Sequence, residues 1–193
     1  MPDRPFALHI TWTCYGNWLP GDDRGFVSRV RDRRPDEPDF PTRREHDAPG
    51  EEYDAGMAGL WRSARDQLKG DPVRLNLEQT RVLLDQFHQT AGYRCWVLHA
   101  AAVMANHAHV VVEALSEVDP SDLLADFKAY GSRTLNRRWG KSVSGRWWTA
   151  GGSKRKKATA DAVEEAIEYV RTQPYALLVW VRDEANQQSE RGT

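Results

Sequence analysis

Apolar and polar residues alternate along several short stretches of the chain, and this alternation is typical of half-buried β-strands. It predicts one strand over residues 7–15 and another over residues 93–101. A third strand carries His107 and His109 among valines, and a last strand covers residues 176–181. Strands are therefore expected from the beginning, the middle and the later part of the chain.

Between these strands, apolar residues recur every three or four positions, which predicts helices. One helix covers residues 77–92, and a second covers residues 121–139 after a capping signature that begins at Pro120. A third helix covers residues 159–173 and is closed by Pro174. The order β, α, β, β, α predicts an α+β fold, with a ferredoxin-like antiparallel sheet and helices on one face.

Three segments fall outside this pattern. Residues 140–152 hold several glycines and are predicted to form an irregular connector. Residues 20–72 are too long for an ordinary loop, and they predict a long, mostly irregular insertion after the first strand, with a short helix near residues 57–68. Residues 174–193 form a C-terminal extension, in which residues 186–193 are predicted to be disordered.

The first candidate site is the pair His107 and His109. Side chains two residues apart on a strand point to the same face, so both imidazoles can bind one cation. The pair by itself is equally consistent with two histidines in the core or on the surface. His9, His88 and His99 occur singly, and they are given no site role because a lone histidine is more often structural.

Tyr169 and Gln173 lie one turn apart on the third predicted helix. They share a flank of its apolar stripe, because successive residues of a helix are about 100° apart. The residues of that stripe are Val163, Ala166, Ile167 and Val170. Without the histidines, the pair would indicate a tyrosine packed at the helix edge and a solvated glutamine. With them, the four side chains can form a tyrosine nucleophile assisted by a metal ion.

These residues resemble the HUH single-tyrosine transposases of small bacterial insertion sequences and their REP-associated relatives. In that family a histidine–hydrophobic–histidine strand precedes a helix that bears the nucleophilic tyrosine, with a glutamine one turn later. The resemblance implies that His107, His109 and Gln173 are the metal ligands and that Tyr169 is the nucleophile. The strand that opens at residue 8 is also similar to the first strand of the family, whose fold is the HUH endonuclease fold.

The resemblance implies a metal-dependent transposase of single-stranded DNA. A phenol has a pKa of about 10, so its attack on a phosphodiester requires a cation such as Mg²⁺ or Mn²⁺. The resulting 5′-phosphotyrosine link keeps the energy of the broken bond, so a free 3′-hydroxyl can rejoin the strand without a nucleotide cofactor. The family also implies hairpin or palindromic DNA ends as partner and a homodimer, with the site assembled within one protomer or between two.

The charge of the chain is uneven although its formal net charge is only −1. Residues 128–157 contain no acid, and they mix cations with the aromatic rings of Tyr130, Trp139, Trp147 and Trp148. Such a mixture suits single-stranded DNA, because cations bind phosphates and flat rings stack on bases. The predicted DNA-binding residues are Lys128, Arg133, Arg137, Arg138, Lys154, Arg155 and Lys156. A solvated basic helix with tryptophans in the core is the alternative, and at least one of Trp147 and Trp148 is expected in the core.

The length and composition favour one domain over residues 1–193, because 193 residues with 40% hydrophobic content suffice for a single core. No signal peptide is recognisable, and no apolar run approaches the ~20 residues that cross a bilayer. Cys14 and Cys95 lie in apolar surroundings without paired spacing, which predicts buried thiols. A cytoplasmic, nucleoid-associated protein without a membrane partner is therefore expected.

Three functions are weighed. The complete set of two histidines, a tyrosine and a glutamine favours a DNA strand transferase. A domesticated DNA-binding protein that no longer transposes would bind hairpins without cutting them. A phosphoesterase would leave no covalent adduct, and a replication initiator usually carries helicase domains for which this chain has neither room nor a phosphate-binding loop. The insertion at residues 20–72 is equally consistent with DNA recognition and with a packed cover over the sheet, which Trp18, Phe26 and Trp61 would support.

Overall fold

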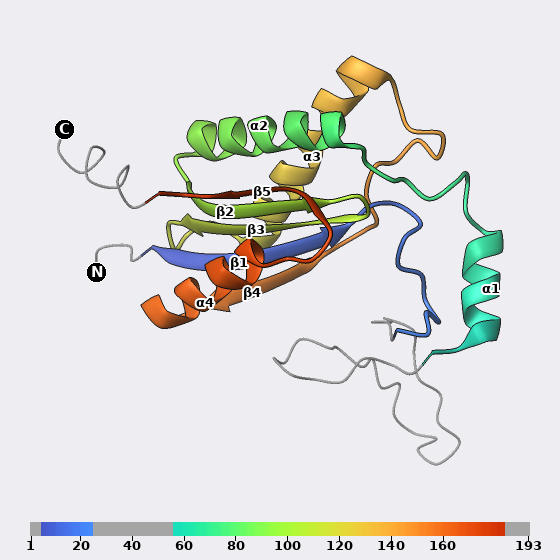
Figure 1. The fold of residues 1–193 in the computed structure, drawn as a ribbon, viewed down its shortest axis with the longest axis horizontal. Helices are drawn as coiled ribbons and strands as arrows, with labels where there is room; N and C mark the ends of the chain where they lie inside the picture. Colours follow the sequence, from blue (N-terminus) through green and yellow to red (C-terminus); the bar gives the residue numbers. More distant parts are fainter. Residues whose placement is uncertain (1–4, 25–55, 184–193) are drawn as a thin grey trace, which may run out of the picture. The chain divides into compact units, whose positions relative to one another are not determined.

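The computed structural model describes residues 5–24 and 56–183 (Figure 1). The chain separates into two compact units, one formed by residues 1–15 with 72–193 and the other by residues 16–71. Most of the predicted irregular insertion and the C-terminal residues predicted to be disordered lie outside the described residues.

The larger unit is built on an antiparallel sheet of five strands in the order β4-β1-β3-β2-β5. Its strands are β1 (Phe6–Thr13), β2 (Val97–Met104), β3 (His107–Ala114), β4 (Ser153–Lys157) and β5 (Ala176–Val181). The order of the first four strands is that of the ferredoxin-like fold, with β3 between β1 and β2. The predicted α+β class and antiparallel sheet are therefore confirmed.

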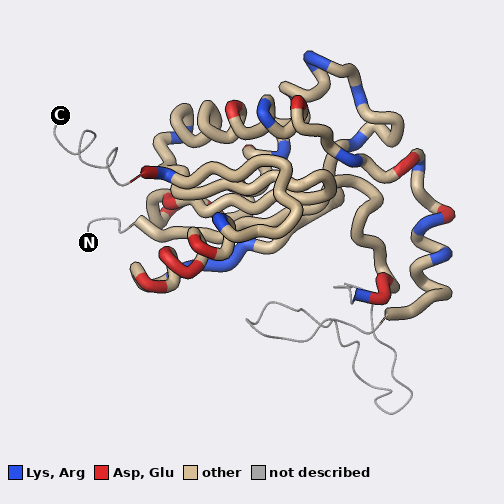
Figure 2. Tube along the Cα trace, in the orientation of Figure 1, with Lys and Arg blue, Asp and Glu red and all other residues tan. Residues whose placement is uncertain are grey.

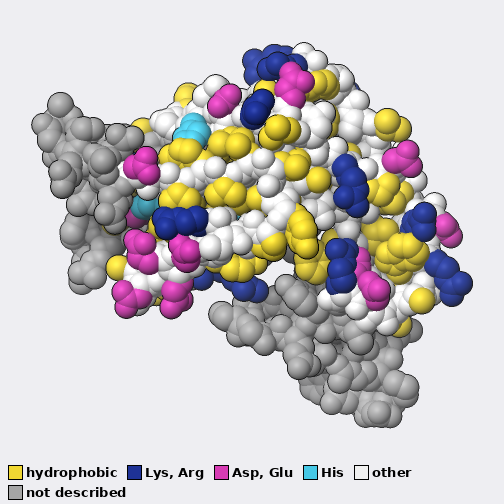
Figure 3. Space-filling model, viewed as in Figure 1, with side chains coloured by type: hydrophobic (Ala, Val, Ile, Leu, Met, Phe, Trp, Pro, Cys, Tyr) yellow, Lys and Arg dark blue, Asp and Glu magenta, His cyan; other side chains and the backbone are white. Residues whose placement is uncertain are grey.

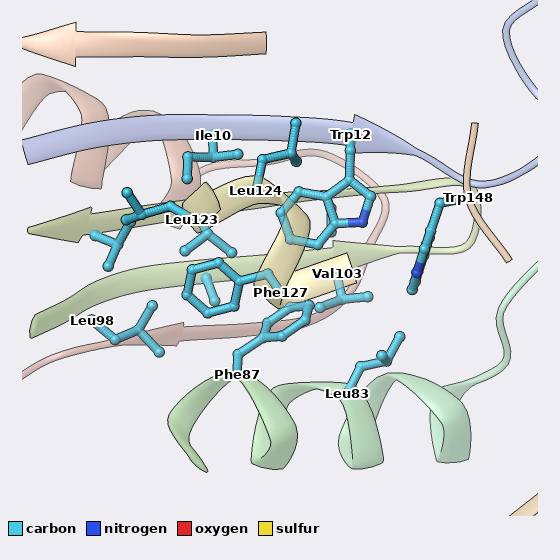
Figure 4. Close-up of a cluster of buried hydrophobic side chains, with 14 of the residues drawn as sticks. Ile10, Trp12, Leu83, Phe87, Leu98, Val103, Leu123, Leu124, Phe127 and Trp148 are labelled. Carbon is cyan, nitrogen blue, oxygen red and sulfur yellow. The ribbon is translucent and has the colours of Figure 1, made fainter. Parts of the chain in front are cut away.

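Two long helices, α2 (Leu77–Arg94) and α3 (Pro120–Trp139), cover one face of the sheet. Asn76 starts α2 by accepting from the backbone N–H of Gln79, whose side chain accepts from the backbone N–H of Asn76. Alternate residues of β1 enter the core beneath these helices, and Trp12 is the largest of them (Figure 4). This face holds most of the buried apolar side chains of the unit.

The short helix α4 (Ala160–Arg171) packs against the opposite face of the sheet, in front of the strands in Figure 1. Thr159 caps it by accepting from the backbone N–H of Ala162. The helix buries Ala166, Ile167 and Val170. They pack on the β2 and β3 residues Ala100, Ala102, Met104 and Val111. The expectation that all helices lie on one face thus holds for α2 and α3, whereas α4 differs because its apolar stripe fits the second face.

Strand β4 directly follows the predicted connector, in a basic stretch where the sequence predicted no strand. Its five residues, Ser153–Lys157, contain no apolar side chain because β4 is an edge strand that is exposed to solvent. Val103, which the valine-rich pattern around the histidines places in their strand, belongs to β2, because residues 105–106 separate β2 from β3. Trp147 and Trp148 are both buried.

The prediction of buried thiols is correct for Cys14 and wrong for Cys95. Cys14 is fully buried in the core under α2 and α3. Cys95 is exposed because it ends α2 in the left-handed conformation, with φ of 57°, and so leaves the apolar face of the helix. Neither cysteine is in a disulfide.

The second unit contains α1 (Ala58–Asp66), within the range predicted for a short helix. The backbone N–H of Met57 donates to the carbonyl of Gly21 (3.0 Å), where φ is +85°. A side chain at Gly21 would overlap the backbone of Trp61, so only glycine suits this position. Over both described stretches, no helix combines the length and the apolar composition needed to cross a membrane.

Candidate active site

The two histidines of β3 lie on the face of the sheet that α4 covers. Ala108 between them is buried in the opposite core, so His107 and His109 project together, with ring centroids 5.0 Å apart. His109 is only 5% exposed, and His107 is half-buried. The strand periodicity had predicted this shared face, and the structure confirms it.

Tyr169 is brought to the same place by α4. Its ring centroid lies 5.5 Å from that of His109, while 52% of the residue stays exposed to solvent. Val170 beside it is fully buried, which fixes the helix against the sheet and orients Tyr169. The tyrosine is therefore both anchored and accessible, and it meets the histidines of its own chain.

Gln173 lies just after α4, whose last residue is Arg171, so the helix ends earlier than predicted. Its amide nitrogen donates to the carbonyl of Tyr169 (3.0 Å), a bond that leaves the amide oxygen unused. Within the described chain Gln173 makes no hydrogen bond to either histidine of β3. Its predicted role as third metal ligand remains a prediction.

Two residues of β1 that the sequence did not assign also belong to this site. His9 Nε2 lies 3.1 Å from His109 Nδ1, and Thr11 Oγ1 lies 2.8 Å from the same nitrogen. The His9 ring is also 5.4 Å from the Tyr169 ring. The polar positions 9 and 11 alternate with buried apolar residues, but only the pairing of Thr11 with His109 shows which site they join.

The hydrogen bond of His107 sets which of its ring nitrogens carries the proton. His107 Nδ1 lies 2.7 Å from Asn106 Oδ1, and a carboxamide oxygen can only accept. His107 Nδ1 is therefore the protonated nitrogen, and Nε2 keeps the lone pair. Thr11 can accept from His109 Nδ1 in the same way, which would leave both Nε2 atoms suited to a metal ion.

Burial keeps His109 and His9 neutral. It lowers the pKa of His109 from 6.5 to about 3, with smaller contributions from His107 and His9. Burial also lowers the pKa of His9 to about 4, helped by the positive charges of Lys157 and Arg155. Neutral imidazole is the form that binds metal ions, so the donors are ready at neutral pH.

The lowered pKa values of His9 and His109 predict a loss of stability in mild acid. Below about pH 6.5 the unfolded chain takes up protons at these histidines while the folded chain does not, so the free energy of unfolding falls until pH approaches the folded values. Urea unfolding at a series of pH values, with a chelator present, measures this slope. A His9→Gln, His109→Gln double variant should show a shallower slope between about pH 6.5 and 5. Identical slopes would contradict the prediction.

The predicted DNA-binding cations differ in how the protein already uses them. Lys128 donates to the backbone carbonyls of Thr149 and Gly151, at 2.7 Å each, and burial lowers its pKa. Arg138 pairs with Glu78 at 2.7 Å. The remaining contacts are those of Arg133 with the Tyr130 ring, Arg137 with Thr134, Lys154 with Ser121 and Lys156 with the Phe6 ring. DNA binding by these residues stays a prediction, and Lys128 has a clear structural role.

The antiparallel sheet carries the histidine pair on its central strand β3, and α4 places Tyr169 beside that pair. The chain belongs to the IS200-like transposase family, whose model matches residues 73–173. It is similar to a putative transposase from Deinococcus radiodurans, with 13% identity, a TM-score of 0.45, and coverage of 88% of this chain and 92% of that one. It is also similar to a REP-associated tyrosine transposase bound to a REP hairpin, with 9% identity, a TM-score of 0.44, and coverage of 85% and 63%. No curated protein matches the chain.

Proposed function

We propose that this transposase cleaves and rejoins single-stranded DNA through a 5′-phosphotyrosine intermediate on Tyr169, with the help of a divalent metal ion. The observation that carries the proposal is the position of Tyr169, half exposed to solvent and with its ring 5.5 Å from that of the metal-ligand candidate His109. A buried tyrosine could not contact DNA. A tyrosine far from the histidines could not attack a phosphate bound beside them.

The reaction exchanges one phosphate ester for another. The phenol oxygen of Tyr169 attacks the scissile phosphorus and forms a new P–O bond, while the bond to the 3′-oxygen of the neighbouring nucleotide breaks. The phenol proton passes to solvent or a nearby base, and the released 3′-oxygen takes up a proton. Attack by another 3′-hydroxyl reverses these steps, rejoins the strand and frees the tyrosine.

The residues present fit a divalent cation. His107 and His109 offer two imidazole nitrogens, and burial lowers the pKa of His109 so that its ring is neutral. Within the described ranges, no group of three or more histidines, cysteines and carboxylates is arranged to hold a metal ion. As the resemblance to the family implies, the amide oxygen of Gln173 is the protein donor proposed to join the two histidines. When bound, Mg²⁺ or Mn²⁺ would polarise the scissile phosphate and hold it in line for attack. The chain's own contribution is to place Tyr169 beside these donors.

The remaining parts of the proposal follow from the family. Single-stranded DNA with hairpin or palindromic ends is the proposed substrate, a homodimer is the proposed assembly, and the nucleoid is the proposed location. Within one chain, α4 already places Tyr169 against His109 of the same chain, which supports cleavage by each protomer on its own. Joining two ends is the step for which a second protomer is proposed.

A covalent-adduct experiment tests the proposal. The protein is incubated with labelled hairpin DNA from the flanks of its own gene and Mg²⁺ or Mn²⁺, and a labelled band should survive denaturing electrophoresis. After nuclease digestion, mass spectrometry should find the nucleotide remnant on the peptide position of Tyr169. Tyr175, which is 94% exposed, is the internal control for non-specific modification.

The same experiment can contradict the proposal. Hairpin binding without any adduct would indicate a domesticated DNA-binding protein of the same fold. A remnant on Tyr175 or on a serine would place the nucleophile elsewhere. An adduct that forms equally well with a chelator present would exclude metal assistance.

A further inference from the structure

The edge strand β4 divides its positive charges between the two faces of the sheet. Directly paired residues of antiparallel strands project to the same face. Lys154 pairs with Ile10 and Lys156 with Leu8, and both apolar partners are buried in the core under α2 and α3. Arg155 pairs with His9, so it projects to the other face, where the candidate active site lies.

The two lysines on the core side are already engaged by the protein. The Nζ atom of Lys154 donates to the hydroxyl of Ser121 at the start of α3 (3.0 Å). The Nζ atom of Lys156 lies 4.8 Å from the centre of the Phe6 ring. These contacts hold β4 and its neighbours together on the side away from Tyr169.

Arg155 and Lys157 lie on the face of the sheet that carries the candidate active site, and they lack such contacts with the rest of the described chain. Arg155 is exposed and Lys157 is half-buried, and neither makes a hydrogen bond or an ion pair with any residue within 5–24 or 56–183. Arg155 pairs directly with His9, and Lys157 pairs with Ala7, two residues before His9 on the same face. His9 in turn contacts the Tyr169 ring, so a continuous row leads from the two cations to the nucleophile.

We propose that Arg155 and Lys157 bind the backbone phosphates of the DNA strand next to the scissile bond. The two side chains are two residues apart on one face of an edge strand, or about 6.6 Å. This spacing suits neighbouring phosphates of an extended single strand. The guanidinium of Arg155 can bind a phosphate through two parallel hydrogen bonds, and Lys157 supplies a point charge beside it. The inference rests on the proposed function, because it assigns the path of that reaction's substrate.

The charges of α4 restrict this path. Asp161, Glu164, Glu165 and Glu168 are exposed on the helix, and Figure 3 shows acidic side chains gathered over it. In Figure 2 the basic β4 runs beside this acidic helix. The acidic helix α4 repels DNA phosphates and the basic strand β4 attracts them. The DNA strand therefore passes Tyr169 on the side of β4. Of the predicted DNA-binding residues in β4, this proposal retains Arg155, and it adds Lys157. Lys154 and Lys156 instead stabilise the position of β4.

The test compares two double variants that remove the same charge from opposite faces of β4. Both are made in a Tyr169→Phe chain, so that binding is measured without cleavage. Arg155→Gln with Lys157→Gln should lower the salt dependence of hairpin-DNA affinity by about 1.4 in log–log slope, since each single-strand phosphate contact contributes about 0.7. Lys154→Gln with Lys156→Gln should leave the slope unchanged. Thermal melting checks that all chains fold.

A second measurement locates the contact. Uncharged methylphosphonates are placed one at a time near the cleavage position, and they should weaken binding of the Tyr169→Phe chain but not of the Arg155→Gln, Lys157→Gln form. Equal slopes for both double variants, or methylphosphonate effects that persist without Arg155 and Lys157, would overturn the inference. Because adducts are not measured here, failure of the phosphotyrosine chemistry would appear in the adduct experiment and leave these slopes intact.

Discussion

Replacing Tyr169 by phenylalanine is expected to reduce DNA cleavage by at least about a thousandfold, because the variant lacks the only atom of this side chain that can attack phosphorus. The fold should not change, since 52% of Tyr169 is exposed and its ring contacts with His9 and His109 are available to phenylalanine. Hairpin binding should also persist. Single-turnover cleavage of a labelled hairpin, followed on denaturing gels, measures the effect.

The matched control is Tyr175→Phe, which makes the same chemical change six positions along the chain. Tyr175 is 94% exposed and lies in the turn between α4 and β5, so its variant should cleave at the wild-type rate. If Tyr169→Phe cleaved within about tenfold of the wild type, the nucleophile would have to be another group. If both variants lost cleavage, the effect would be on the α4–β5 region and not on a particular hydroxyl.

Replacing Trp12 by alanine is expected to lower the free energy of unfolding by about 3–5 kcal/mol. The residue is 1% exposed and lies among the rings of Phe87, Phe127 and Trp148, at centroid distances of 5.5, 6.4 and 6.1 Å (Figure 4). The alanine variant would leave a cavity in place of the indole. The neighbouring rings can fill it only in part, because they belong to α2, α3 and the segment before β4. Domains of this size have about 5–15 kcal/mol in total, so urea unfolding should show a large shift in midpoint.

Trp12→Phe is the control that separates loss of volume from loss of the ring. In the described part of the chain the indole N–H of Trp12 is buried without a hydrogen-bond partner, and phenylalanine removes this unpaired donor. The expected loss is about 1–2 kcal/mol, clearly below that of alanine. Equal losses for the two variants would show that the indole contributes more than its packing suggests.

The sequence predicted those elements whose side chains have one apolar face. The strand at residues 176–181 was placed without error, and α2 and α3 began within a residue of their predicted starts. β4 was missed because an edge strand open to solvent needs no apolar residues, and its Lys-Arg-Lys-Lys run carried no alternation. The end of α4 was predicted too late, at Gln173 instead of Arg171. A proline sets the latest point at which a helix can end, but the helix can end earlier.

The sequence predicted those site residues whose side-chain direction follows from the local repeat of a strand or helix. It missed those that reach the site only through the pairing of distant strands. The shared face of His107 and His109 follows from the two-residue repeat of a strand, and the position of Tyr169 follows from the stripe of α4. His9 and Thr11 reach His109 across about a hundred residues of sequence, and no local pattern specifies that β1 lies beside β3. In the same way, the face of the sheet to which Arg155 and Lys157 project is set by the pairing of β4 with β1.

Because neighbouring residues of β1 and β3 serve opposite faces of the sheet, these strands tolerate changes of side chain far better than changes of length. With the pairing before the insertion kept, one residue inserted just before His109 would turn His109 into the apolar core and place the inserted residue beside Tyr169. Libraries for the laboratory evolution of this protein should therefore vary residue types along β1 and β3 at constant length, and confine insertions and deletions to the connecting segments.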